Sequence, residues 1–143
     1  MPYLSREAYL LRFGEPETIR VTDEARAGAI DAPKVDAALA DASLIIDGYV
    51  ANSYDLPIDP VPPVLDRICG DLAREMLHRT RPVEAVTLAA DRARSMLKDI
   101  GAGRMKLPVT GGGVAEPAAP TGLASWGQAA DARIFSADKL AGF

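Results

Sequence analysis

Apolar residues recur every three or four positions over most of residues 1–106, the period of an amphipathic α-helix. Ser5 can cap a short helix that runs through Phe13, where Gly14 supplies the stop. A second short segment starts at Pro16. Its apolar side chains are expected to turn inward: Ile19 and Val21.

Three longer helices follow. The first begins at Asp31 and Pro33, the second runs from about Pro63 to His78, and the third opens at Pro82 and ends at glycines 101 and 103. The inward positions of the first are Val35, Leu39, Ala42, Ile46 and Tyr49, widened by Ile45 and Val50. Those of the second are Leu65, Ile68, Cys69, Leu72 and Met76. Those of the third are Val86, Ala89, Ala93, Met96 or Leu97, and Ile100.

Between the first two long helices, residues 52–63 (NSYDLPIDPVPP) hold four prolines, which predicts an ordered connector rather than a helix. Residues 105–109 are compatible with a short strand. The pattern as a whole predicts a mainly α fold. We expect a compact bundle of about four to five helices with a proline-rich connector and an extended C-terminal arm.

The last 37 residues differ from the rest, because prolines, glycines and alanines make up 18 of them and cannot build a core. We therefore divide the chain into a helical domain, 1–106, and a flexible tether with a docking arm, 107–143. A tail that binds nothing is the plainer alternative, but large aromatics such as Trp126 are depleted in inert linkers. The residues expected to bind a partner are Trp126, Arg133, Ile134, Phe135, Lys139, Leu140 and Phe143.

Charge is distributed unevenly along the chain. Residues 1–60 carry 11 acids and 5 bases, residues 61–106 carry 6 and 9, and residues 107–143 carry 3 and 2, for a net charge of −4. This balance argues against a uniformly basic nucleic-acid binder. An acidic half joined to a basic half would let copies meet head to tail around a ring, although ordinary solvated helix faces explain the same asymmetry.

The sequence lacks the features of a membrane or exported protein. No stretch approaches the roughly 18 apolar residues of a membrane span, and the first 14 residues lack the uncharged apolar run of a signal peptide. The single cysteine, Cys69, excludes an internal disulfide. We expect a soluble, cytosolic product with no membrane association.

The side chains that carry most enzyme chemistry are scarce. His78 is the only histidine, and its place near a helix end favours a C-terminal polar residue over a catalytic base. Cys69 falls on the apolar face of its helix, where a thiol is a small hydrophobe. Asp71 and Glu75 lie four residues apart beside arginines, which predicts surface ion pairs. We therefore assign no catalytic, metal-binding or cofactor-binding residue, and expect no enzyme.

Residues 23–34 (DEARAGAIDAPK) have the outline of a calcium-binding EF-hand loop. The third, fifth and twelfth positions lack the oxygen ligands that such a loop needs. A structural role is expected instead: a turn at Gly28, a core contact at Ile30 and a helix cap at Asp31.

Three stretches follow one another along nearly the whole chain. They are the opening YLSREAYLLRFGEPETIRVTD at 3–23, the middle IDGYV at 46–50 with YDLPI at 54–58 and VP at 61–62, and the ending RIFS at 133–136 through LAGF at 140–143. Together they resemble the small head–tail connector (adaptor) proteins of Mu-like tailed phages and prophages, formerly a domain of unknown function. Two departures are Ala137, where a charged residue is expected, and an unusually long Ala/Pro tether.

This resemblance implies a phage structural protein without a cofactor. Its copies would form a homo-oligomeric, twelve-fold ring between portal and tail, which completes the DNA-filled head. The implied partners are the portal protein and a tail-side neck or tail terminator protein, with DNA passing through the channel without sequence-specific binding. The implied location is the neck of the virion, and the host cytoplasm during assembly.

Two other classes of function stay open. A small helical DNA-binding regulatory protein would use the basic stretch 74–104, but Asp91 and Asp99 interrupt it and no helix-turn-helix spacing emerges. An enzyme subunit would need a nucleophile, a base and an orienting group, which one histidine and one helical cysteine do not supply.

Overall fold

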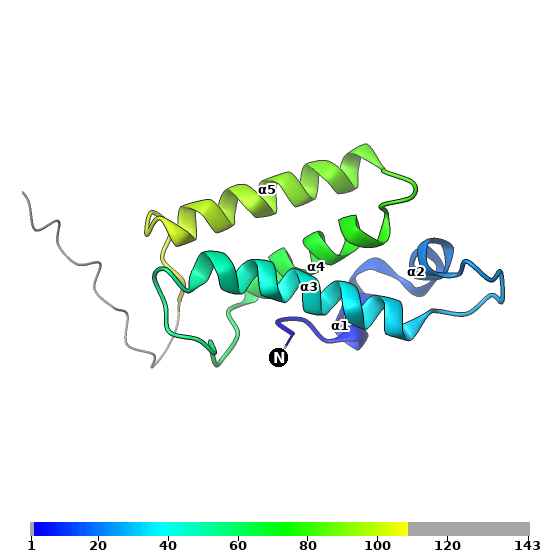
Figure 1. The fold of residues 1–143 in the computed structure, drawn as a ribbon, viewed down its shortest axis with the longest axis horizontal. Coiled ribbons are helices and arrows are strands. Elements are labelled where there is room, and N and C mark those ends of the chain that lie inside the picture. Colours follow the sequence, from blue (N-terminus) through cyan, green and yellow to red (C-terminus); the bar gives the residue numbers. More distant parts are fainter. Residues whose placement is uncertain (1, 109–143) are drawn as a thin grey trace, which may run out of the picture.

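The computed structural model describes residues 2–108, which form five α-helices and no strand (Figure 1). The helices are α1 (Arg6–Phe13), α2 (Glu15–Thr22), α3 (Ala32–Val50), α4 (Pro63–Leu77) and α5 (Glu84–Gly101). The predicted mainly α bundle is confirmed. The strand expected from residue 105 is wrong over 105–108, because the chain turns sharply after α5. Gly103 has φ 71°, and the amides of Arg104 and Met105 both donate to the Asp99 carbonyl.

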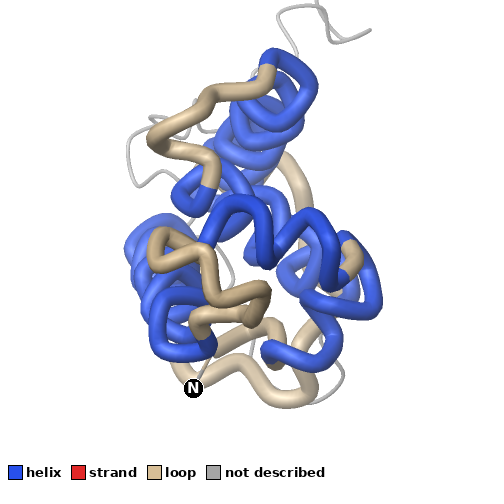
Figure 2. Tube along the Cα trace, turned by 90° about the vertical axis from the view of Figure 1, so that its right-hand side faces the viewer, coloured by secondary structure: helices blue, strands red, loops and turns tan. Residues whose placement is uncertain are grey.

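Helix α4 lies at the centre of the bundle and runs antiparallel to α3 and α5 (Figure 1). The short helices α1 and α2 lie on the other side of the molecule from α5. Figure 2, seen along the bundle, shows the α4–α5 turn and the α2–α3 loop at one end. The proline-rich loop, residues 51–62, lies at the opposite end with the C-terminus of α5 (Figure 1).

The core is built on α4. Between Val64 and His78 only Arg67 is exposed, because α3, α5 and the N-terminal segment cover the rest of the helix. Full burial of one leucine or isoleucine stabilises the fold by roughly 1.5–3 kcal/mol. The buried apolar side chains of α4 are Leu65, Ile68, Cys69, Leu72, Ala73 and Leu77.

The predicted register of α3 is confirmed, and that of α5 is corrected at one position. Asp31 caps α3, with its side chain accepting a hydrogen bond from the Lys34 amide. In α5 Ala90 is fully buried, whereas the predicted Ala89 is only half-buried. Leu97 rather than Met96 fills the core. Both alanines are small and apolar, so the periodicity alone did not distinguish them.

Helix α2 buries two threonines, whereas the predicted Ile19 and Val21 are half-buried, with Val21 packed against the core. The Thr18 hydroxyl donates to the Gly14 carbonyl at 2.9 Å, and the Thr22 hydroxyl donates to the Thr18 carbonyl at 2.8 Å. Because the helix backbone satisfies both hydroxyls, the threonine methyl groups can face the core at little cost.

The α2–α3 loop has the structural role expected for residues 23–34. The Asp23 carboxylate accepts the amides of Ala27 and Gly28, at 2.8 and 2.6 Å. Gly28 has φ 72°, a conformation that favours glycine, and the half-buried Ile30 packs against the core. The Asp23 carboxylate therefore stabilises the turn of its own loop.

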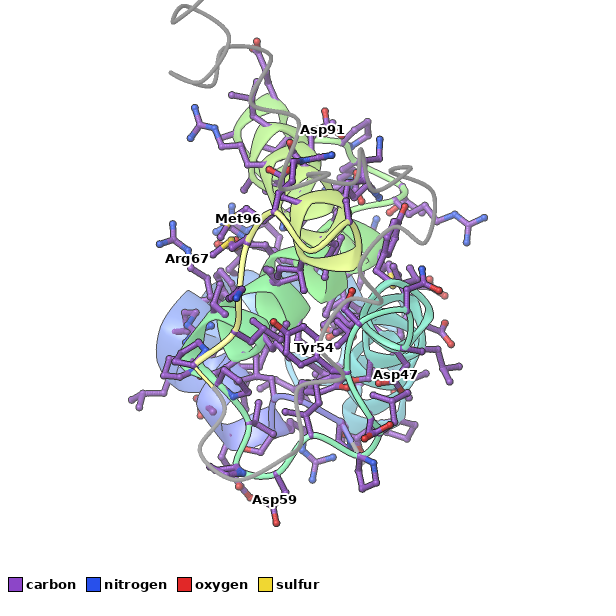
Figure 3. The ribbon with its side chains drawn as sticks, turned by 90° about the vertical axis from the view of Figure 1, so that its left-hand side faces the viewer. Asp47, Tyr54, Asp59, Arg67, Asp91 and Met96 are labelled. Atoms are coloured by element: carbon purple, nitrogen blue, oxygen red, sulfur yellow. The ribbon has the colours of Figure 1, made fainter. Side chains whose placement is uncertain are left out.

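The proline-rich loop is ordered by two side chains that turn inward, Tyr54 and Ile58. Figure 3 shows Tyr54 in the middle of this end of the molecule, with Asp59 at the rim. The Tyr54 hydroxyl accepts a hydrogen bond from the buried Leu107 amide at 2.8 Å, and the Ser53 hydroxyl donates to the Gly101 carbonyl at 3.2 Å. The loop thereby anchors the chain where it leaves α5.

A close backbone approach between α3 and α5 gives a test of this packing. A Cβ added at Gly101 would lie 2.7 Å from the Tyr49 carbonyl oxygen, so Gly101→Ala should destabilise the protein by roughly 1–3 kcal/mol. Gly48→Ala is the matched control, because nothing lies within 4 Å of its added Cβ. That change should stabilise the helix by roughly 0.5–1 kcal/mol. Urea unfolding measures both, and equal stabilities would contradict the close contact.

Candidate functional site

His78 ends α4 and binds Glu17 of α2. Its Nε2 lies 3.0 Å from Glu17 Oε1. Arg74 donates to the same carboxylate from Nε at 2.6 Å and from Nη2 at 3.0 Å. The Arg74 guanidinium also lies 4.9 Å from the centroid of the Phe13 ring, a cation–π contact. The Glu17–Arg74–His78 cluster therefore fastens α1 and α2 to α4.

The charge of Glu17 is stabilised in this setting. Partial burial opposes ionisation, but hydrogen bonds from Arg74 and His78 outweigh it and hold the pKa of Glu17 below its usual range. The other ring nitrogen of His78, Nδ1, is buried and has no hydrogen-bond partner among residues 2–108. The contact of Nε2 with Glu17 gives His78 a structural role at the end of α4.

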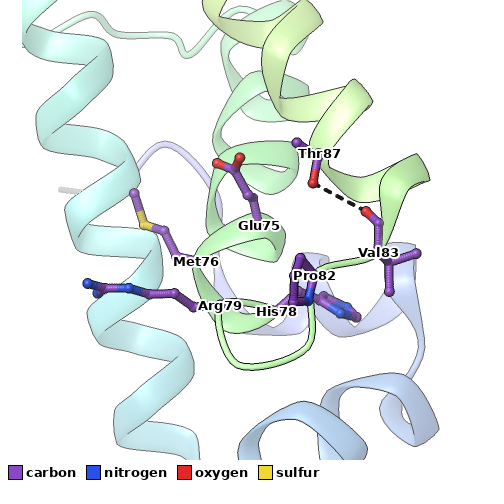
Figure 4. A pocket seen from close by; sticks show the side chains of 7 residues that line it. All are labelled: Glu75, Met76, His78, Arg79, Pro82, Val83 and Thr87. Carbon is purple, nitrogen blue, oxygen red and sulfur yellow. Dashed lines mark hydrogen bonds between the residues drawn. The ribbon is translucent and has the colours of Figure 1, made fainter.

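A hollow of about 390 Å³ lies beside His78 (Figure 4). Two of its polar groups are engaged: the Thr87 hydroxyl donates to the Val83 carbonyl at 3.4 Å, and Glu75 is ion-paired with Arg94. The lining residues are Glu75, Met76, His78, Arg79, Pro82, Val83 and Thr87.

Cys69 is buried between helices, as expected. Its Sγ lies 3.6 Å from the Ser43 hydroxyl and 3.8 Å from the Leu39 carbonyl, and burial raises the pKa of the thiol. A neutral, enclosed thiol is a packing group rather than a nucleophile. In the part of the chain that the structure describes, no cluster of three histidine, cysteine, aspartate or glutamate side chains could hold a metal ion.

The ion pairs of α4 and α5 neutralise part of the basic stretch 74–104. Arg94 binds Glu75, and Arg104 donates from Nη2 to Asp99 at 2.6 Å. Arg74 is taken by Glu17, so it is not the partner of Glu75. These pairings leave fewer free cations for phosphate contacts, which counts against the DNA-binding alternative.

Asp71 forms a looser ion pair with Arg67, at 3.9 Å. Burial raises the pKa of Asp71, and the nearby arginines only partly offset that effect. Asp71 therefore has the ion pair that the sequence predicted, whereas Glu75 takes its partner from α5 rather than from α4.

The outward side of α3 carries an exposed leucine among small residues, a feature that the sequence analysis missed. Leu44 is 68% exposed at the middle of the helix. Its position follows from the register, since residues 4 and 7 apart share a face and the core face is opposite. We call this surface the α3 outer face; its exposed members are Pro33, Ala37, Ala40, Leu44 and Gly48.

The predicted partner-binding residues all lie outside residues 2–108 and have no structural description here. They are Trp126, Arg133, Ile134, Phe135, Lys139, Leu140 and Phe143. None of the helices within the described range is long and apolar enough to cross a membrane.

Comparison with known proteins gives consistent matches to Mu-like phages. The family described as "Bacteriophage Mu, Gp36" matches residues 3–124. The "Mu-like prophage FluMu protein gp36" of Haemophilus influenzae is 36% identical over 101 residues, covering 68% of this chain and 64% of that protein. "Gene product J" of Escherichia phage Mu is 42% identical over 60 residues, covering 42% of this chain and 43% of that protein. The chain thus spans less than two thirds of either relative.

The Glu17–Arg74–His78 cluster predicts a pH-dependent contribution to stability. Glu17→Gln should lower the free energy of unfolding at neutral pH by roughly 1–3 kcal/mol. Because the pKa of Glu17 is lower in the folded state, its contribution is complete above the unfolded value of about 4.3. It is lost as the pH falls through the folded value, so the two proteins should converge in acid.

Urea unfolding from about pH 7 to about pH 3 measures this convergence. Glu15→Gln is the control, since Glu15 is exposed in the same helix. It should change stability by less than about 0.5 kcal/mol. A Glu17→Gln protein that matches the parent at neutral pH would show that the cluster does not support the fold.

Proposed function

The chain belongs to the Bacteriophage Mu Gp36 family, and from that membership we propose that it is a head–tail adaptor, a structural protein of the phage neck. Copies form a homo-oligomeric ring, twelve-fold by resemblance, between the portal and the tail. The ring completes the DNA-filled head and provides the passage for DNA.

The observation that carries this proposal is the extent of the family match. It runs over residues 3–124, across the helical domain and into the C-terminal segment. The chemistry of the domain is compatible with a purely structural role, because His78 is held by Glu17 and Cys69 is buried in the core. A tightly tied helical bundle suits a rigid subunit of a ring.

The partners proposed for this ring are the portal protein on one side and a tail-side neck or tail terminator protein on the other. DNA passes through the channel and is not read by sequence. This fits the ion pairs of Arg74, Arg94 and Arg104, which compensate those three charges within the subunit.

The C-terminal arm is proposed to bind the portal side of the ring. The chain leaves the folded domain at a fixed point, since the Leu107 amide is bonded to Tyr54. Residues 110–132 number 23, a length of about 26 Å as a random coil and at most about 76 Å fully extended. Docked apolar residues near the C-terminus would contribute roughly 1.5–3 kcal/mol each before the ordering cost. Repetition around a ring multiplies a weak contact through avidity.

Removal of the C-terminal arm should leave the helical domain folded but prevent its attachment to the portal or tail. A chain lacking residues 114–143 should keep the helical signal and thermal unfolding of the domain, but should not attach to portal or tail. Circular dichroism and complementation of a phage that depends on this protein measure the two effects. A chain lacking only residues 114–120 is the control, since it keeps the terminal cluster and should still attach. Infectious particles made with the longer deletion would refute the docking role.

Electron microscopy of the purified protein mixed with its portal tests the ring directly. We expect rings, or rings stacked on the portal. Dispersed monomers that do not bind the portal would overturn the proposed function. Duplex DNA provides a separate control, because tight binding by the free monomer that weakens steeply with salt would favour the DNA-binding alternative.

A further inference from the structure

The α3 outer face has the composition of a protein contact rather than of a solvated helix surface. Leu44 is 68% exposed, and its neighbours on the face are small or apolar. Most helices of this length carry charged or polar residues at the positions opposite the core. Small residues also allow another surface to approach the helix backbone closely.

The edges of this face are acidic. Asp41 precedes Leu44 by three residues and Asp47 follows it by three, so the two carboxylates flank the leucine on either side. Asp41 has no ion pair within residues 2–108. Two copies of this face meeting each other would bring like charges together, which disfavours a symmetric contact. The complementary surface is therefore apolar with basic edges.

A surface of that kind lies on the opposite side of the same molecule. Figure 3 shows Asp47 on one side and Arg67 and Met96 on the other. Arg67 is 77% exposed, and Arg92 lies one turn before Met96 on the same side of α5. We call this surface the α4–α5 flank; its members are Val64, Arg67, Ala89, Arg92 and Met96.

The charge balance of the flank is favourable to an acidic partner. Arg92 is exposed and has no ion pair in the described part of the chain, while Arg67 is held only loosely, 3.9 Å from Asp71. Val64, Ala89 and Met96 are half-buried and supply apolar surface beside the arginines, and Met96 follows Arg92 by one turn in the direction of Arg67.

We propose that the α3 outer face of one copy packs against the α4–α5 flank of the next copy, so that copies associate head to tail. The inference rests on the proposed ring and specifies its subunit contact. A ring of many members turns each copy only slightly from the last, by about 30° for twelve, so its two contact surfaces must lie on nearly opposite sides. The α3 outer face and the α4–α5 flank meet that condition, and their charges are complementary.

Cysteine cross-linking in the full-length chain tests this contact. The only native cysteine, Cys69, is buried, and Cys69→Ala provides a background free of thiols. In that background Leu44→Cys and Met96→Cys are introduced together, and a short bismaleimide is added across a protein concentration series. We expect a ladder of dimers, trimers and higher species, because each copy then has both halves of the contact. Either cysteine alone should leave the chain monomeric.

Leu11→Cys combined with Met96→Cys is the matched control, since Leu11 is 90% exposed but lies on α1. Its ladder should be at least about tenfold weaker, a difference of about 1.4 kcal/mol in contact free energy. An equal ladder from the control, dimers from Leu44→Cys alone, or no cross-link at any concentration would each overturn the inference.

A second variant keeps this result separate from the fate of the proposed function. Leu44→Asp in the native background should weaken self-association at least about tenfold without changing thermal unfolding. Leu11→Asp should not. If the protein binds the portal but the Leu44–Met96 cross-link does not form, the proposed subunit contact is wrong and the proposed adaptor function stands. If the cross-linked ladder forms but the protein does not bind the portal, the subunit contact stands and the adaptor function is wrong.

Discussion

The burial of α4 is the constraint on which the rest of this structure depends. A helix with almost no solvent-facing surface must be covered from several directions, and α3, α5 and the N-terminal segment each cover one of them. Ion pairs hold these covering elements to α4: Glu17 of α2 binds Arg74, and Arg94 of α5 binds Glu75. Since the central helix uses Asp66, Arg74 and Glu75 to hold its neighbours, the proposed contact surfaces lie mainly on α3 and α5.

This arrangement, a buried central helix covered by outer helices, suits the proposed role. A subunit of a ring needs a stiff body and two outward surfaces rather than a cleft. The buried thiol and histidine contribute to the stiff body. The α3 outer face, with its acidic edges, and the α4–α5 flank, with its two arginines, would provide two such surfaces. The asymmetry between the acidic residues 1–60 and the basic residues 61–106 thereby acquires a structural interpretation.

Periodicity predicted the long helices well, because a buried helix face repeats every three or four residues and Asp31 or a proline marks each start. It failed where the chemistry of single residues decides the register. The threonines of α2 are buried because their own helix satisfies their hydroxyls. The partners Glu17 and His78 lie 61 residues apart, so no local pattern could pair them. The exposure of Leu44 follows from the register of α3, because Leu44 lies opposite the buried positions of that helix. The C-terminal residues predicted to bind a partner stay a prediction.

The hydrogen bond between the Leu107 amide and Tyr54 determines how mechanical load would enter the domain. A pull on the chain beyond residue 108 reaches Leu107 first, where the hydrogen bond from its amide to the Tyr54 hydroxyl resists it. It does not act directly on the last turn of α5, which would otherwise unzip one backbone bond at a time. Tyr54 thus protects the C-terminal end of α5 from a force applied to the chain that follows it.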